Sequence, residues 1–416
     1  MPEPQSPRPI TRGSFQTHAL TAAHWGVVGM AASMPVSRAV FNACALLMIM
    51  GWLLSGQWGQ RLAMIRHHRV ALASLGLFAV GACSLLWAHT PGADPWDQLQ
   101  EYSRLLYVPL IVTLLQHQRV WWRRAWWAWL AGMLLTLAAY LLDIGLEVPG
   151  TRTYGTHTAG QGVFYHHIAQ GMVLSFLGAY GLHRALRNEQ TPRVRAFWLA
   201  VALATLAGLI AVGESRTGQL SVLAAYVLVV LTHLPPRARV WGVLTTVLVA
   251  GALVMGSQRV QDRLMLAFQE AATFTQDGER TSVGARLQAW QFSSQVIAQA
   301  PWLGHGLGAY RPLAHAHFAH SPICQLGVCE QPHNQFVLTA VETGALGLLA
   351  LAAFLVAPLR GGEAQRGPMA RLRWPFIAIV VVTACFDSSL QIQAQSFFVV
   401  TTLALLTSAD PPPDSG

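Results

Sequence analysis

Long apolar segments separated by short polar stretches run through most of the chain, and we predict membrane-spanning helices from them. A helical span requires about 20 mostly apolar residues. Twelve segments qualify, at residues 19–34, 39–56, 70–88, 105–117, 125–143, 166–183, 197–212, 217–233, 240–256, 336–357, 374–388 and 395–409. A soluble domain usually carries about 25% charged residues, whereas only 11% of these 416 residues are charged and 53% are hydrophobic. The pattern therefore predicts an all-α polytopic membrane protein with about twelve transmembrane helices.

The arginines support this topology, because basic residues concentrate in cytoplasmic loops. With the N-terminus in the cytoplasm, 18 of the 27 basic residues, all of them arginine, fall in inner loops. Both termini are therefore expected inside, with the first apolar segment retained as a span. The net charge of +9 follows from this distribution, so membrane lipids rather than nucleic acid are the expected surroundings. Five tryptophans are predicted to anchor the inner face of the membrane: Trp121, Trp122, Trp126, Trp127 and Trp129.

The longest polar interruption divides the chain into three parts. We expect transmembrane helices in residues 1–256, a long periplasmic loop with amphipathic helices in 257–335, and the last transmembrane helices with a cytoplasmic tail in 336–416. A second outer segment, residues 89–104, is predicted to contain a short interfacial helix. Residues 144–165, rich in Gly and Thr, are expected to form an irregular outer loop.

The long loop itself is predicted to be largely helical. Ser257 can cap a helix that continues to about Phe274, and Ser282 can cap a second helix that ends near Ala300. The turn at 304–308, with three glycines, is expected to allow a ligand to approach the backbone closely. Two such helices would form a cap on the outer membrane face.

Arginines near the outer span ends are candidates for anion binding. Arg216 follows Glu214, so it either pairs with that carboxylate or clamps a phosphate with its planar guanidinium. Ser215 and Thr217 would add hydroxyl contacts in the second case. Arg280 and Arg286 flank the start of the second loop helix; each is either solvated or part of a basic pocket with Arg216, and Arg286 has the further option of stacking on Trp290.

His333 is the candidate general base, because it lies where the long loop enters a span and its side chain titrates near neutral pH. A structural or solvated histidine is the alternative. Asn334 would orient His333 or the substrate, and Tyr310 is a further substrate-binding candidate in the loop. Glu342 is interpreted as structural support with a functional possibility.

A metal site is also considered, since His315, His317 and His320 precede Cys324 and Cys329 in the long loop. Their spacing fits no established zinc pattern, and a disulfide between Cys324 and Cys329 is favoured over a metal site if the loop lies outside the cytoplasm. We predict no metal ion and no cofactor. With no Asp-x-Asp pair in an outer loop, neutralisation of a phosphate would fall to arginine.

Three stretches, taken in order, resemble the O-antigen ligase superfamily of bacterial inner-membrane glycosyltransferases. They are Ser215-Arg216-Thr217-Gly218 at the start of a span, Arg286-Leu287-Gln288-Ala289-Trp290 followed by Pro301-Trp302-Leu303-Gly304-His305-Gly306, and His333-Asn334 followed by Glu342-Thr343-Gly344-Ala345-Leu346-Gly347. Each motif is short, and together they cover about the second half of the chain. The superfamily also contains O-antigen polymerases and protein O-oligosaccharyltransferases.

The resemblance implies a GT-C-like fold and a metal-independent glycan transfer at the periplasmic face of the inner membrane. The implied donor is a glycan on undecaprenyl diphosphate, and for a ligase the acceptor is a hydroxyl of lipid A–core oligosaccharide. It also implies that Arg216 and Arg286 hold the diphosphate and that His333 takes the acceptor proton, with inversion at the anomeric carbon. Arg280 lies outside the clearer motif.

Ligase is preferred over polymerase and protein glycosylation, because the chain has one dominant outer loop and no large extra periplasmic domain. The competing class is a non-enzyme, a transporter of polyprenyl-linked sugars. A transporter would need charged groups buried at mid-span, whereas Arg216 and His333 fall at predicted outer span ends.

Overall fold

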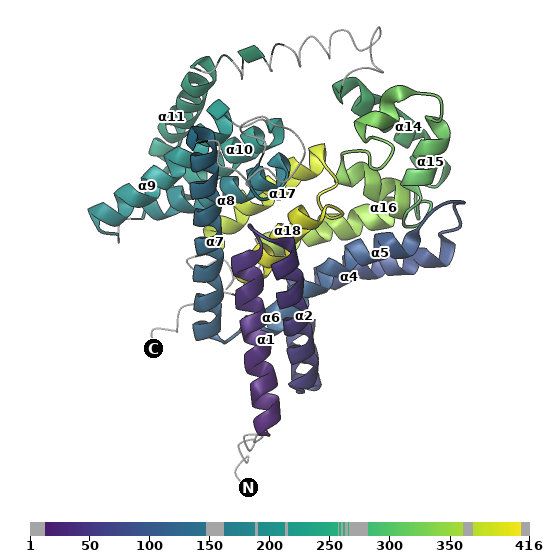
Figure 1. Ribbon diagram of the computed structural model, residues 1–416, viewed down its shortest axis with the longest axis horizontal. Helices are drawn as coiled ribbons and strands as arrows, with labels where there is room; N and C mark the ends of the chain where they lie inside the picture. The colour runs from purple at the N-terminus through teal and green to yellow at the C-terminus, as the bar shows by residue number, and fades with distance from the viewer. Residues whose placement is uncertain are drawn as a thin grey trace.

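The fold is described from a computed structural model over residues 13–146, 162–187, 190–212, 215–256, 258, 261–262, 265, 282–360 and 369–408. Within these residues the regular secondary structure is helical (Figure 1). A helix lies at each of the twelve predicted segments: α1 (Ser14–Ser33), α2 (Arg38–Leu54), α4 (Arg69–Ser84), α6 (Tyr107–Leu115), α7 (Arg119–Leu146), α8 (His167–Ala185), α9 (Pro192–Ala207), α10 (Arg216–His233), α11 (Pro236–Met255), α16 (Gln335–Val356), α17 (Arg373–Phe386) and α18 (Gln393–Thr407). The all-helical architecture is confirmed for this part of the chain.

The number of membrane crossings is less than twelve when judged by helix length and apolarity alone. Five described helices are long and apolar enough to cross a membrane. A sixth is added if α2 and α3 (Trp58–His67), which meet at an angle of 115°, form one broken span. The prediction placed the α3 residues in an inner loop, whereas they form a helix. Twelve crossings therefore remain a prediction.

Apolar side chains face outward on several helices, as expected for a protein surrounded by lipid. The clearest case is α11, an apolar helix of 20 residues with mean hydropathy 1.8. Only 6% of its most apolar stretch is buried within the protein. Val240, Trp241 and Leu248 on this helix are all more than 60% exposed. Such a surface is unfavourable in water, so this chain is a multi-pass membrane protein.

Helices α8 and α18 form the centre of the bundle, because nearly every residue of each is buried. Two of the tryptophans predicted as membrane anchors belong to this core: Trp126 is 3% exposed and Trp129 is fully buried. The anchoring prediction is wrong for these two residues. Their rings pack edge-on against Tyr180 and Phe176 of α8. Both tryptophans therefore lie on the face of α7 that packs against α8.

A small cap from the long loop lies beside α16 (Figure 1). It contains α14 (Ser282–Gln299), α15 (Tyr310–His317) and a 3-10 turn (Pro322–Leu326). The second predicted loop helix is thus confirmed as α14, whereas the first, at 257–274, lies almost wholly outside the described residues. The cap has its own apolar cluster, which includes Leu338 and Val341 of α16. This shared cluster fixes the cap onto the membrane-embedded bundle.

The glycine-rich turn after α14 packs closely against protein backbone, and its Gly308 also lines a cavity. Gly304 has φ of +66°, and a Cβ there would lie 2.5 Å from the Glu342 carbonyl carbon. The turn inserts where α16 breaks at Gly344, which has φ of +62°. The Gly306 amide donates to the Glu342 carbonyl oxygen at 2.8 Å. Only glycine permits both the left-handed backbone and this close approach.

Candidate active site

His333 lies at the junction between the cap and α16, in a backbone conformation that its neighbours hold in place. Its φ is +50°, in the left-handed region, which costs about 1–3 kcal/mol for a residue other than glycine. On one side, the indole N–H of Trp290 donates to the Pro332 carbonyl oxygen at 2.8 Å. On the other side, Asn334 begins α16 by accepting the amide protons of Phe336 and Val337. Strain maintained in this way is typical of functional positions.

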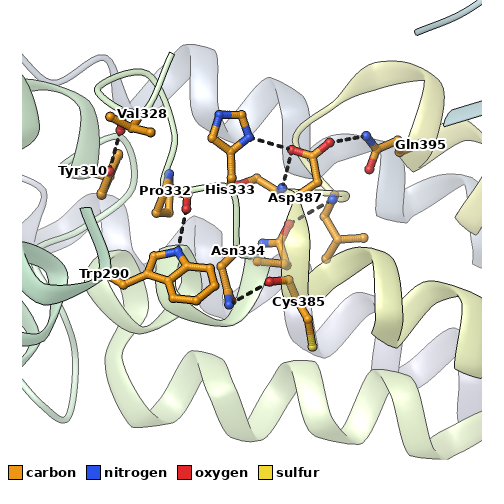
Figure 2. A network of polar contacts seen from close by, with 12 residues as sticks. Trp290, Tyr310, Val328, Pro332, His333, Asn334, Cys385, Asp387 and Gln395 are labelled. Carbon is orange, nitrogen blue, oxygen red and sulfur yellow. Dashed lines mark hydrogen bonds and ion pairs between the residues drawn. The ribbon is translucent and has the colours of Figure 1, made fainter. Parts of the chain in front are cut away.

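The imidazole of His333 faces a buried carboxylate (Figure 2). Its Nδ1 lies 3.3 Å from Oδ1 of Asp387, a residue that is 2% exposed and follows α17. Gln395 of α18 donates to Oδ2 of the same carboxylate at 2.6 Å, and the Ser388 amide donates to Oδ1 at 3.0 Å. Asp387 is therefore oriented by α18 and by its own turn, and it can orient the histidine in turn.

Two further side chains connect the His333 segment to the Asp387 segment. Asn334 donates through Nδ2 to the Cys385 carbonyl oxygen at 3.1 Å. Gln335 accepts the Leu390 amide proton through Oε1 at 2.9 Å. Both polar atoms of the Asn334 side chain thus contact protein. This supports the expectation that Asn334 orients His333 rather than the substrate. These connections hold the base and the carboxylate in register across about fifty residues of sequence.

Arg286 brings positive charge from α14 to the same site. Burial lowers the pKa of its guanidinium, the negative charge of Asp387 raises it, and the positive charge of Arg216 lowers it again. Arg286 therefore lies within electrostatic range of both groups, as the predicted basic pocket requires. Trp290, one helical turn further along α14, uses its indole N–H for the Pro332 contact described above.

His166, just before α8, is a fourth charged or titratable group near Asp387. Burial lowers the pKa of His166, while the Asp387 carboxylate raises it and His333 lowers it. Asp387 is thus close enough to act on Arg286, His166 and His333 from the ends of three different elements. A single carboxylate, that of Asp387, thus lies near Arg286 and both histidines.

The residues around Arg216 are largely used in building the start of α10. The hydroxyl oxygen of Ser215 accepts the Gly218 amide proton at 3.0 Å and is the N-terminal cap of the helix. Thr217 is 8% exposed. At Gly218 the backbone packs against Gly171 of α8. A Cβ added to Gly171 would lie 3.0 Å from the Cα of Gly218. The motif therefore sets the helix start that carries Arg216, and Glu214 lies outside the described residues.

Other sequence-predicted candidates lie further from the base or outside the described residues. Tyr310 is buried on α15 and donates its phenol proton to the Val328 carbonyl oxygen at 2.6 Å, so it holds the end of the cap together (Figure 2). Arg280 lies outside the described residues. Glu342 is 1% exposed, and its Oε1 accepts the Gly308 amide proton at 3.0 Å.

The cysteines of the cap form a disulfide between Cys324 and Cys329, which decides between the two predicted alternatives. His315 lies close to these sulfurs, but a disulfide sulfur is not a thiolate ligand. The Nε2 of His315 instead binds Oε1 of Glu330 at 2.9 Å. The disulfide closes a short loop over the site: a Cβ on Gly327 within it would lie 3.7 Å from Nε2 of His333.

Sequence reasoning missed Asp387, which contacts His333, and Gln395, which holds Asp387. A signal was present in Asp387-Ser388-Ser389, a carboxylate followed by two hydroxyls between apolar segments. A buried carboxylate at a span end is costly unless it is bound, so its position already suggested a role. Its partner could not be read from the sequence, because His333 precedes it by 54 residues.

Comparison with known proteins matches residues 199–352 to a family model described as O-antigen ligase. No curated protein matches the chain. The matched residues run from α9 into α16 and contain Arg216, Arg286 and His333, whereas Asp387 lies beyond them. Together with the multi-pass membrane bundle, this match over part of the chain supports a relationship to the O-antigen ligase superfamily.

Proposed function

We propose that this protein transfers O-antigen polysaccharide from undecaprenyl diphosphate to a hydroxyl of lipid A–core oligosaccharide, as an inverting, metal-independent glycosyltransferase. The observation that carries the proposal is the His333–Asp387 pair with Arg286 in electrostatic range of both Asp387 and Arg216. A base beside an anion clamp is the arrangement that a hydroxyl nucleophile and a diphosphate leaving group require.

The Asp387 contact determines which nitrogen of His333 acts as the base. An ionised carboxylate only accepts hydrogen bonds, so Nδ1 carries the proton that faces Oδ1 of Asp387. The lone pair is then on Nε2, which receives the acceptor proton. As this proton moves, the imidazole becomes an imidazolium whose charge the Asp387 carboxylate stabilises.

The chemical step is a single displacement at the anomeric carbon of the donor. The acceptor oxygen forms the new glycosidic bond, its proton goes to Nε2 of His333, and the bond to the phosphate oxygen breaks. That oxygen leaves with the bonding electron pair as part of undecaprenyl diphosphate. Attack opposite the leaving group inverts the anomeric configuration.

Arg216 and Arg286 hold the diphosphate and stabilise the negative charge that grows on it during bond cleavage. Guanidinium groups bind phosphate oxygens through two parallel hydrogen bonds. Their effect on the barrier is electrostatic and depends on their being in place before the reaction. Ser215, Thr217 and Arg280 are proposed as supporting contacts to the donor.

The proposal places the site at the periplasmic face of the inner membrane in a GT-C-like bundle of about twelve spans. Residues 257–335 form the periplasmic loop, and the polyprenyl tail of the donor lies between helices. The apolar outer surface of the bundle is consistent with access of such a tail from the lipid.

Purified full-length protein in detergent, supplied with lipid-linked O-antigen and lipid A–core oligosaccharide, tests this function directly. We expect glycan joined to the core without any membrane gradient. Transfer only to a second lipid-linked glycan would assign a polymerase, and transfer only to protein would assign a protein O-oligosaccharyltransferase. Movement of the donor across vesicles without transfer to any acceptor would establish the transporter class.

Replacing Asp387 with asparagine is expected to lower kcat by about 10²–10⁴-fold, the range typical of an acid–base contribution. The amide of asparagine can donate to Nδ1 of His333, which would move the proton to Nε2 and remove the basic lone pair. The KM values for donor and acceptor should change little, because Asp387 is buried behind the base. Steady-state kinetics measure this split, with the thermal unfolding midpoint as a check on folding. A kcat within threefold of wild type would refute the orienting role.

Treatment with EDTA is expected to leave the transfer rate unchanged, because the arginines rather than a divalent cation neutralise the diphosphate. The measurement compares initial rates before and after dialysis against the chelator, with added Mg²⁺ or Zn²⁺ as separate arms. Loss of activity that zinc restores would contradict the metal-independent step and direct attention to the His315–His320 segment.

A further inference from the structure

A polar cavity of about 380 Å³ lies between α5 (Pro95–Ser103), α15, α16 and the segment after Asp387. This volume is within the range of pockets that bind small molecules or single groups of larger ones. Its wall contains five carboxylates, from Asp94, Asp97, Glu101, Glu330 and Glu342. Gln98, Gln331 and Gln391 add amide groups.

The net charge of this cavity is negative. Its Arg311 and His315 side chains both bind one carboxylate, that of Glu330, at 2.7 and 2.9 Å. Glu101 pairs with Arg104 beneath the wall. Asp94, Asp97 and Glu342 form no ion pair among the described residues. A diphosphate would be repelled here, whereas hydroxyl or amino groups would find many acceptors.

Two buried polar atoms in the wall have neither a hydrogen-bond nor an ion-pair partner within the part of the chain that the structure describes. They are Oε2 of Glu342, on a side chain that is 1% exposed, and Nε2 of Gln98. Buried polar groups are nearly always bonded, because an unmade bond is costly. The amide nitrogen of Gln98 needs an acceptor, and the carboxyl oxygen of Glu342 needs a donor or, when it is protonated, an acceptor. A sugar hydroxyl supplies both roles from one atom.

The cavity shares its wall with the segments that hold the base. Gln331 is two residues before His333, and Gln391 and Ile392 belong to the turn that begins at Asp387. A ligand in this cavity is therefore bound next to the general base, through groups whose charge is opposite to that of Arg216 and Arg286.

We propose that this acidic cavity binds the terminal sugar of the acceptor glycan. The cavity holds the hydroxyls of that sugar that do not react, and an adjacent hydroxyl of the same sugar reaches His333. The inference rests on the proposed function and adds a division of the site by charge. The donor's anomeric carbon is bonded to the diphosphate, so the donor reacts beside the arginines. The hydroxyl-rich acceptor, which must deliver its proton to His333, occupies the carboxylate-lined side.

Gln98→Leu and Glu342→Gln test this assignment in the purified full-length protein. Each variant is expected to raise the KM for lipid A–core oligosaccharide about tenfold, in line with the loss of one buried hydrogen bond or charge-assisted contact. The KM for the lipid-linked donor should stay within twofold of wild type. Gln100→Leu is the matched control, because Gln100 is exposed on the same helix and does not line the cavity.

Calorimetric titration with lipid A–core oligosaccharide, without donor, separates this inference from the proposed function. Weaker binding to Gln98→Leu than to Gln100→Leu supports the cavity assignment even if the wild type shows no transfer. Equal binding to the two variants overturns it even if transfer proceeds normally. A raised donor KM with an unchanged acceptor KM would also overturn it. Gln98 lies on a short surface helix, so its variant provides the decision if Glu342→Gln does not fold.

Discussion

Replacing His333 with alanine is expected to reduce kcat for glycan transfer by at least about 10²–10⁴-fold, because the acceptor hydroxyl loses its general base. The side chain is 18% exposed and contacts the buried Asp387 carboxylate, so the thermal unfolding midpoint of the variant is measured as a check on folding. Binding of the lipid-linked donor should be retained, since the arginines carry that contact. Transfer assays and donor-binding measurements on the same purified sample give the two quantities.

His320→Ala is the matched control for this prediction, because His320 is an exposed histidine in the same cap. Its activity should equal that of the wild type. Near-normal transfer by His333→Ala would refute the assignment of His333 as the base. It would also refute the proposed role of Asp387 in orienting the His333 ring for catalysis. Loss of activity in both variants would indicate general damage to the cap rather than loss of a base.

Replacing Arg216 or Arg286 with lysine is expected to lower kcat by about 10²–10³-fold, the usual loss when one preorganised donor to a developing negative charge is removed. Lysine keeps the positive charge but lacks the planar pair of donors that matches two phosphate oxygens. The double variant should lose less than the product of the two single losses, because both side chains act on one diphosphate. Single-turnover rates with saturating donor measure this directly.

Arg237→Lys serves as the control for the arginine series, since Arg237 is exposed near the start of α11. It is expected to be fully active. Single lysine variants that retain wild-type rates would show that point charges suffice, and the bidentate clamp would be wrong. Strictly multiplicative losses would show that Arg216 and Arg286 act on separate groups.

Local features of the fold were predictable because their signals lie within a few residues. Apolar segment length located helices at all twelve predicted positions, and a serine with helical spacing after it located α14. Cys324 and Cys329 are five residues apart, so their pairing needs only a local turn. The motif residues Arg216, Arg286 and His333 also stood out, because charged and titratable groups are rare in such an apolar chain.

Features that depend on contacts between distant segments were not predictable in the same way. Trp126 and Trp129 have the composition of membrane anchors, but their position relative to α8 makes them core residues. The glycines at 304–308 suggested close approach of a ligand, but Gly304 packs against the broken backbone of α16, Gly306 against Ala88 and Gly308 against Asp94. In both cases the residue type allows two environments, and only the neighbouring helix selects one.

The sequence by itself determined that this protein is a helical membrane protein and marked Arg216, Arg286 and His333 as candidate site residues, because hydropathy and residue type act locally. Only the tertiary structure decided that Asp387, held by Gln395, contacts His333 and that an acidic cavity lies near this segment. The physical reason is that a hydrogen bond or a charge acts over a few ångströms in space. The chain brings those atoms together only after α14, α16 and α18 have packed.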